Sequence, residues 1–314
     1  MTMRITHIGG PTALEGSAMT HLRTIRQPRL RWIVTAALLA SLAGLVLSQV
    51  GAADAAGSTT AGAATAGAET SSHGGAKPTV VLVHGAWADS GSWDQVVARL
   101  QRQGYPVIAF PTPLRSLPDD SAYLAAFLSS VPGPIVLVGH SYGGAVITNA
   151  ATGNENVKAL VYVDGFLPDE GETLGELLGT PPGSCVLGPP TEIFDLRPIP
   201  GAPPEVVDAY VKQRLFPSCF ANDLPAKQAA VLAATQRPIS TLTLGQPSGP
   251  PAWAEIPSWA LVGTVDRVIL PATQLFMAER AGARIVKVKA SHLSMISRPG
   301  AVTRLIVAAA RSTS

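Results

Sequence analysis

The sequence predicts an α/β fold in which a mainly parallel sheet carries helices on both faces and an inserted lid. Short apolar runs rich in β-branched residues alternate with helical patterns from Lys77 onward, which is typical of strand-helix-strand units. The chain has 314 residues and 46% hydrophobic content, enough for one large domain with a substantial core. The alternation breaks over residues 168–256, and we interpret this insertion as a lid.

The strands and helices follow in a regular order. Residues 79–83 form a continuous run dominated by β-branched residues, as expected for a strand buried on both faces. A capping box beginning at Ser92 predicts a helix through about Gln103. Further helices are expected at residues 121–129, 144–150 and 299–311, and further strands at residues 106–110, 134–139, 157–163, 258–262 and 284–288.

The insertion is rich in proline and contains both cysteines of the chain, Cys185 and Cys219. Helices are expected within it at residues 204–215 and 225–235. An insertion of this length is usually a lid or a binding element. We expect it to emerge at the carboxyl ends of the strands, where such sheets bind ligands. Its abundant Pro, Leu, Ala and Val suggest a substrate with an apolar portion.

The first 76 residues are expected to lie outside the folded domain, residues 77–314. A basic segment precedes an apolar run at residues 32–50 and the small-residue pattern Ala53 to Ala55, which predicts a secretory signal peptide over residues 1–55. The protein would then be secreted or extracytoplasmic. An uncleaved membrane anchor at residues 32–50 is the alternative. Residues 56–76 are almost all Gly, Ala, Ser and Thr and are expected to form a flexible linker.

The cysteine count and the charge limit the partners. Export and an even count favour a disulfide between Cys185 and Cys219, with two buried free thiols as the alternative. The net charge of +2 gives no indication of a nucleic-acid partner. No cluster of His, Cys and carboxylate residues has the spacing of metal ligands, so neither a metal nor another cofactor is expected. Nothing implies an obligate protein partner.

Residues 139–143 carry the most informative motif. They follow an apolar strand pattern and precede a small-residue helical pattern, so Ser141 lies at a sharp turn between a strand and a helix. Gly139 and Gly143 leave room for the close packing of strand against helix, and Ser141 is expected in a strained conformation with its hydroxyl exposed. This arrangement is typical of a serine nucleophile.

A serine nucleophile needs a general base, and elimination identifies His292. Three of the six histidines lie in the leader or the linker. His140 is adjacent to Ser141, so its side chain is expected to point away from that of Ser141, and His84 ends the first strand. His292 alone lies in the loop after the last strand, where this fold would deliver a base to the serine.

Two aspartates are candidates for the carboxylate that orients the base. Asp266 and Asp164 both follow strands, and the chain order Ser, Asp, His fits either. Asp266 is preferred, because its strand comes directly before the strand that precedes His292. For Asp164 the alternative role is to fix the start of the insertion.

Backbone amides must stabilise the oxyanion of a tetrahedral intermediate. The amide of Tyr142 directly follows the nucleophile, and the amide of Ala86 lies in the loop after the first strand, where Gly85 lets the backbone turn inward. Trp87 is expected to pack beside this loop and is also a candidate to line the substrate pocket.

Together these residues resemble the α/β-hydrolase superfamily over about residues 78–311. Segments 83–87, 139–144, 163–168, 263–267 and 291–293 are similar to the branch that contains bacterial pyrethroid-hydrolase-type esterases, plant methylesterases and hydroxynitrile lyases. The resemblance implies an α/β-hydrolase fold, with Asp266 as the acid and the Ala86 and Tyr142 amides as oxyanion donors. Hydroxynitrile lyases place a lysine directly after the catalytic histidine, whereas this chain has Leu293, which argues against cyanohydrin chemistry.

The sequence therefore predicts a cofactor-independent carboxylic ester hydrolase that acts on a small-molecule substrate through an acyl-enzyme. Two alternatives stay open: a lyase of the same fold, and a binding or sensor protein with little turnover, because fold does not determine function.

Overall fold

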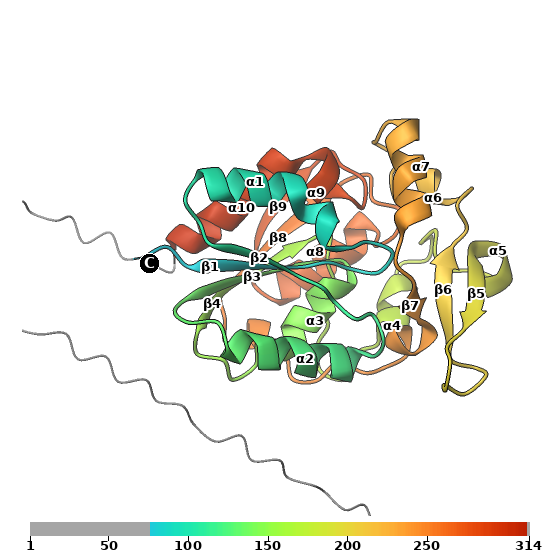
Figure 1. The fold of residues 1–314 in the computed structure, drawn as a ribbon, viewed down its shortest axis with the longest axis horizontal. Helices are drawn as coiled ribbons and strands as arrows, with labels where there is room; N and C mark the ends of the chain where they lie inside the picture. Colours follow the sequence, from blue (N-terminus) through green and yellow to red (C-terminus); the bar gives the residue numbers. More distant parts are fainter. Residues whose placement is uncertain (1–75, 313–314) are drawn as a thin grey trace, which may run out of the picture. The chain divides into compact units, whose positions relative to one another are not determined.

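The computed structural model describes residues 76–312. Its centre is a six-stranded parallel sheet in the order β2-β1-β3-β4-β8-β9 (Figure 1). The strands are β1 (Thr79–Val83), β2 (Val107–Phe110), β3 (Ile135–His140), β4 (Val157–Val163), β8 (Ser258–Gly263) and β9 (Arg284–Val288). The predicted α/β class and parallel sheet are confirmed. The predicted leader and the linker up to residue 75 lie outside the described residues.

Burial follows position in the sheet. Every residue of β3 and β8 is buried, because helices cover both faces of the central strands, whereas the edge strand β9 is partly exposed. Helices α1 (Asp94–Arg102) and α10 (Pro299–Arg311) lie on one face, and α2 (Leu117–Ser129) and α3 (Tyr142–Ala150) on the other (Figure 1). Helix α8 (Pro271–Arg280) packs beside β8 and β9. None of the helices between residues 76 and 312 is long and apolar enough to cross a membrane.

Three helix starts differ from the predictions, and one of them is α3, which begins at Tyr142, two residues before its predicted start. The capping box expected to begin at Ser92 is wrong, because Asp89 is the capping residue and Ser92 is the third residue of the short 3-10 helix η1 (Ser90–Trp93) that precedes α1. The Asp89 carboxylate accepts the backbone N–H of Ser92 at 3.0 Å. Helix α2 begins at Leu117, four residues before the predicted start, with Ser116 as its capping residue.

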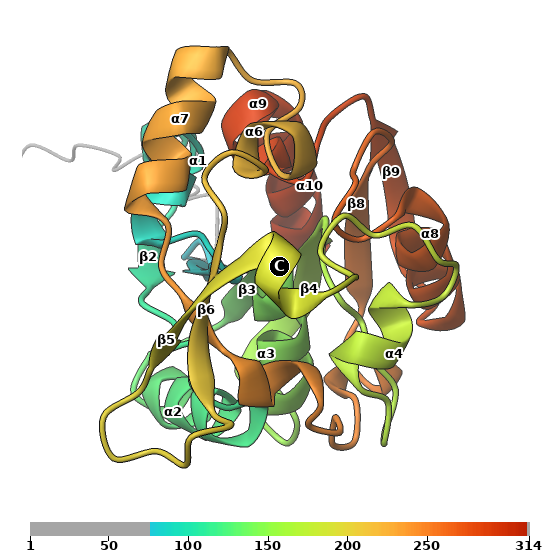
Figure 2. The ribbon, with the colours of Figure 1, turned by 90° about the vertical axis from the view of Figure 1, so that its right-hand side faces the viewer.

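The insertion, residues 168–256, lies beyond the carboxyl ends of the parallel strands (Figures 1 and 2). It contains a three-stranded antiparallel sheet in the order β5-β6-β7. Its elements are α4 (Leu174–Leu178), α5 (Pro190–Ile193), β5 (Phe194–Pro198), β6 (Val207–Val211), α6 (Phe216–Cys219), α7 (Ala226–Thr235), β7 (Ile239–Ser240), η2 (Thr241–Leu244) and η3 (Ala252–Ala254).

Of the two helices predicted in the insertion, one is confirmed and one is wrong. Helix α7 matches the expectation at residues 225–235. The segment expected as a helix at residues 204–215 instead contains strand β6, which pairs with β5 and β7. Ala209 and Val211 are buried and alternate with less buried residues, which is the period of a strand. Cross-strand pairing with residues distant in sequence decides this outcome.

Candidate active site

Ser141 lies on the turn between β3 and α3, as the motif predicts. Its φ of 52° and ψ of −122° are unusual for a residue with a side chain. A Cβ on Gly139 would lie 2.5 Å from the carbonyl oxygen of Gly143, and a Cβ on Gly143 would lie 2.4 Å from that of Val83. Both positions therefore require glycine, because backbone atoms occupy the space of a side chain.

The structure brings the hydroxyl of Ser141 to the imidazole of His292. The Oγ of Ser141 lies 2.9 Å from Nε2, and the Oδ2 of Asp266 lies 2.7 Å from Nδ1. In this arrangement Nδ1–H donates to the carboxylate and Nε2 accepts from the hydroxyl. Burial lowers the pKa of His292 to about 3, so the ring is neutral at pH 7 and its Nε2 lone pair is available.

Asp266 is held by donors on both carboxylate oxygens. Its Oδ1 accepts the backbone N–H groups of Val268 at 2.7 Å and Ile269 at 3.2 Å, and its Oδ2 accepts the side-chain amide of Gln274 at 2.7 Å. Burial raises the pKa of Asp266, and these donors act in the opposite direction by stabilising the ionised form. These three hydrogen bonds therefore set the orientation of the carboxylate toward His292.

Asp164, the other candidate acid, does not contact the imidazole of His292. Its Oδ1 accepts the backbone N–H of Gly263 at 2.8 Å, and its Oδ2 accepts that of Ser294 at 3.1 Å. Asp164 therefore joins the end of β8 to the loop that follows His292. Burial and the nearby charge of Asp266 raise its pKa.

The two residues whose amides are expected to bind an oxyanion lie at the same small cavity as Ser141. Ala86 and Tyr142 both line it, and both are nearly fully buried. Within residues 76–312, no protein group accepts a hydrogen bond from either backbone N–H. A Cβ on Gly85 would lie 2.6 Å from the Cβ of Ser141, so glycine lets this loop approach the serine closely.

Trp87 connects the loop after β1 to the insertion. Its Nε1–H donates to the carbonyl of Ala209 on β6 at 2.8 Å. The indole stacks on Phe194, with ring centroids 5.7 Å apart, and meets the ring of Phe220 edge-on at 5.2 Å. Trp87 also lines the cavity beside Ser141. It therefore both packs beside the loop after β1 and borders the candidate pocket, the two positions considered from the sequence.

The cavity at Ser141 is narrow in this structure. Its volume is about 20 Å³, room for roughly one water molecule. Ser141 is 3% exposed and His292 is fully buried, whereas the sequence predicts an exposed hydroxyl. The insertion supplies an apolar wall to the cavity through Leu174, Leu178, Val186, Ile239 and Leu244. A substrate larger than water therefore reaches Ser141 only if this wall moves.

Sequence reasoning missed the roles of two other histidines. The Nε2–H of His140 donates to the carbonyl of His292 at 2.8 Å, so this side chain holds the backbone of the neighbouring loop. The Nε2 of His84 accepts the backbone N–H of Thr112 at 3.1 Å. Burial lowers the pKa of both rings, to about 4 for His84, so both are neutral at pH 7. Neither partner is near in sequence, so no local pattern indicates these bonds.

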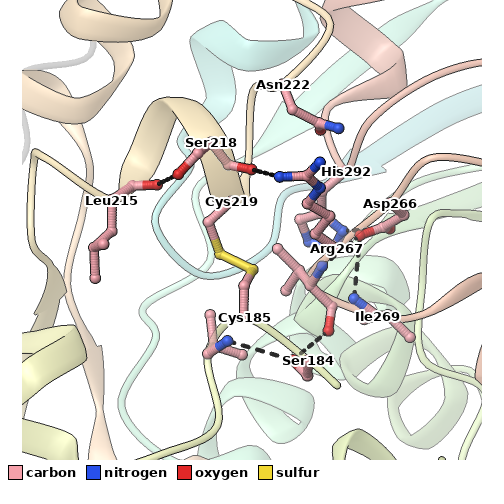
Figure 3. Close-up of a disulfide and its surroundings, with 12 residues drawn as sticks. Ser184, Cys185, Leu215, Ser218, Cys219, Asn222, Asp266, Arg267, Ile269 and His292 are labelled. Atoms are coloured by element: carbon pink, nitrogen blue, oxygen red, sulfur yellow. Dashed lines mark hydrogen bonds and ion pairs between the residues drawn. A yellow bond between two sulfur atoms is a disulfide. The ribbon is translucent and has the colours of Figure 1, made fainter. Parts of the chain in front are cut away.

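Cys185 and Cys219 form a disulfide within the insertion (Figure 3). The predicted pairing is present in the structure. Among residues 76–312, no group of three or more His, Cys, Asp or Glu side chains is placed to hold a metal ion.

Comparison with known proteins places the chain among hydrolases. The model of the alpha/beta hydrolase family matches residues 80–305. A pyrethroid hydrolase of Sphingobium wenxiniae is 28% identical over 236 residues, which are 70% of this chain and 83% of that protein. A carbendazim hydrolyzing esterase of a Nocardioides species is 34% identical over 114 residues, 31% of this chain and about half (46%) of that protein's length.

The fold is also that of solved structures. The crystal structure of a pyrethroid hydrolase from Sphingobium faniae superimposes with a TM-score of 0.58 at 23% identity, covering 75% of this chain and 98% of that one. At this identity the likeness establishes the α/β-hydrolase fold alone.

Proposed function

Because the chain belongs to the alpha/beta hydrolase family, we propose that it is a serine hydrolase that cleaves carboxylic esters through an acyl-enzyme. The observation that carries the proposal is the continuous hydrogen-bonded line from the Ser141 hydroxyl through His292 to Asp266. In this proposal Ser141 is the nucleophile, His292 is the base, and Asp266 is the acid that orients the base.

The first half of the reaction forms the acyl-enzyme. Ser141 Oγ bonds to the ester carbonyl carbon while Nε2 of His292 takes the hydroxyl proton. The amides of Ala86 and Tyr142 donate to the oxygen that becomes negatively charged. The intermediate collapses, the bond from carbon to the alcohol oxygen breaks, and His292 returns its proton to the departing alcohol.

The second half releases the acid. A water molecule attacks the acyl carbonyl carbon as His292 takes one of its protons, and the same two amides again stabilise the oxyanion. The bond to Ser141 Oγ then breaks, and His292 returns the proton to the serine. Throughout, Asp266 holds the imidazole in the Nδ1–H tautomer and stabilises its transient positive charge.

The substrate we propose is a small-molecule ester with an apolar portion. The cavity beside Ser141 is bordered mainly by apolar side chains, which favour an apolar acyl or alcohol group. The names of the pyrethroid hydrolase and carbendazim esterase relatives are in keeping with such a substrate. We propose that the insertion acts as a lid, since its apolar wall leaves about 20 Å³ beside Ser141 and has to move to admit an ester.

Hydrolysis of a p-nitrophenyl ester series by residues 56–314 tests this function. Wild type should hydrolyse at least one ester of the series, and Ser141→Ala should lower kcat by several orders of magnitude while the protein remains folded. Equal rates for the two proteins would exclude Ser141 as the nucleophile. A tight ligand without turnover on any ester would instead support a binding protein.

We further propose that the protein is exported. The disulfide supports this location, because such bonds persist in oxidising compartments. Fractionation of cells that express the full chain should place it outside the cytoplasm. A cytoplasmic protein with both cysteines reduced would contradict the proposal.

A further inference from the structure

The loop that carries Asp266 is held from one side by the segment around Cys185. The backbone N–H of Cys185 donates to the carbonyl of Arg267 at 2.8 Å, and the hydroxyl of Ser184 donates to the carbonyl of Val268 at 2.6 Å (Figure 3). These two acceptors belong to the residues that directly follow Asp266. The segment around Cys185 therefore fixes the backbone on the C-terminal side of the aspartate.

The same loop is held from the other side by the segment around Cys219. The guanidinium of Arg267 donates to the carbonyl of Ser218 at 3.2 Å, and the side-chain amide of Asn222 donates to the carbonyl of Val265 at 3.1 Å. Figure 3 shows Ser218 and Asn222 on the side of the disulfide opposite Ser184. Contacts from the two segments thus bracket Asp266 in the sequence.

The segment after Cys219 also contacts the loop of the base. The ring of Phe220 meets the imidazole of His292 edge-on, with centroids 5.5 Å apart. The carboxylate of Asp223 accepts a hydrogen bond from the hydroxyl of Ser291 and lies 3.9 Å from the guanidinium of Arg298. One short stretch, residues 218–223, therefore touches both the acid loop and the base loop.

The disulfide is the covalent link between these two segments. The cysteines are 34 positions apart in the sequence, and their Cα atoms are 5.8 Å apart. Little regular structure surrounds them: Cys219 ends the four-residue helix α6, and Cys185 lies outside helices and strands. The bond thus fixes the distance between two segments that both hold the Asp266 loop.

We propose that the Cys185–Cys219 disulfide is a positioning element for the Asp266–His292 pair. The inference rests on the proposed function, in which this pair activates Ser141. Without the bond the two segments separate, the acid loop loses contacts on both sides, and the carboxylate is no longer held against Nδ1 of His292. The step most affected is proton transfer, which depends on the distance between hydrogen-bonded atoms.

The test compares oxidised wild type, wild type reduced with dithiothreitol, and the variant C185A/C219A, on one p-nitrophenyl ester. Reduction and the double substitution should each lower kcat by about tenfold to a hundredfold, the effect of displacing a catalytic group by about 1 Å. KM should stay within about twofold, and the double variant should not respond to dithiothreitol. The downfield NMR resonance of the His292 Nδ1 proton should weaken or shift in both cases.

Two further variants keep the inference testable if C185A/C219A does not fold. Asn222→Ala leaves the disulfide intact and removes one bond to the acid loop, so it should lower kcat about threefold to tenfold, less than the loss of the disulfide. Lys212→Met is the matched control, because it removes an ion pair with Asp195 inside the insertion that touches neither loop. It should behave as wild type in kcat and in its response to dithiothreitol.

Several results would overturn the inference. An unchanged kcat in folded, reduced protein, an increase confined to KM, or an equal loss in Lys212→Met would each do so. A loss explained by unfolding at the assay temperature, seen by circular dichroism, would make the bond structural only. The NMR measurement needs no ester. If oxidised wild type hydrolyses no ester, the proposed function fails, but the resonance of the His292 Nδ1 proton still shows whether the disulfide positions the Asp266–His292 pair.

Discussion

Replacement of Asp266 by asparagine is expected to reverse the tautomer of His292. The backbone N–H groups of Val268 and Ile269 can only donate, so the new side chain keeps its oxygen at the Oδ1 position. Its NH2 group then faces the Nδ1 of His292. Nδ1 has to become an acceptor, Nε2 carries the proton instead, and the ring can no longer accept the proton of Ser141.

The structure indicates the size of this effect. Loss of the correct tautomer is expected to lower kcat by about 10³ to 10⁴, or about 4 to 5 kcal/mol of barrier. The control is Gln274→Met, which also removes a donor to Oδ2 of Asp266 but leaves the tautomer intact. It should lower kcat by roughly tenfold or less, since a supporting hydrogen bond is lost rather than the base.

The assay is steady-state hydrolysis of a p-nitrophenyl ester, with the folded fraction checked by thermal melting. A loss of less than tenfold in folded Asp266→Asn would refute the assignment of the acid. So would a larger loss of kcat in Asp164→Asn than in Asp266→Asn, because the Asp164 carboxylate accepts the backbone N–H groups of Gly263 and Ser294, whereas that of Asp266 bonds Nδ1 of His292.

Three further predictions concern the turn, the cavity and the base. Gly143→Ala should lower the free energy of unfolding by about 1 to 3 kcal/mol in urea titrations, because its Cβ would lie 2.4 Å from the carbonyl oxygen of Val83; equal stability would contradict the packing argument. Leu178→Ala should destabilise by about 2 to 5 kcal/mol but raise kcat/KM for longer acyl chains relative to acetate, and an unchanged chain-length profile would mean that Leu178 does not border the bound ester. The pKa of His292 is lowered to about 3, so the neutral base persists below pH 6.5 and kcat/KM should decline only at lower pH; a decline centred at pH 6.5 would mean that the ring is solvated during the reaction.

Local patterns predicted the central sheet and the position of the candidate nucleophile. The predicted bounds of strands β1 and β4 agree with the structure to the residue, because strands buried on both faces are rich in apolar and β-branched residues. The turn at Ser141 was equally predictable, since glycine at positions 139 and 143 reflects contacts within a few residues of the serine and with one neighbouring strand.

The features that depend on distant contacts could not be predicted in the same way. Strand β6 forms because β5 and β7 pair with it, and its own sequence also fits a helix. Strand order and the family resemblance favour Asp266 over Asp164, but both aspartates follow strands, and the hydrogen bonds of the folded chain show which of them faces His292. The narrowness of the cavity at Ser141 depends on how the insertion packs, which no sequence periodicity indicates.

Burial of His292 makes this residue a weaker base. The weaker base explains why kcat is expected to depend strongly on Asp266. Burial lowers the pKa of the His292 imidazole to about 3. Protonation of the buried ring is therefore unfavourable, because water does not solvate the resulting cation. In the transition state that cation lies between the Asp266 carboxylate and the negative oxyanion, which together replace the lost solvation. The same dry surroundings strengthen both interactions. A buried base therefore suits the chemistry only if the carboxylate stays in contact with the ring, so any contact that holds the Asp266 loop should affect kcat more than KM.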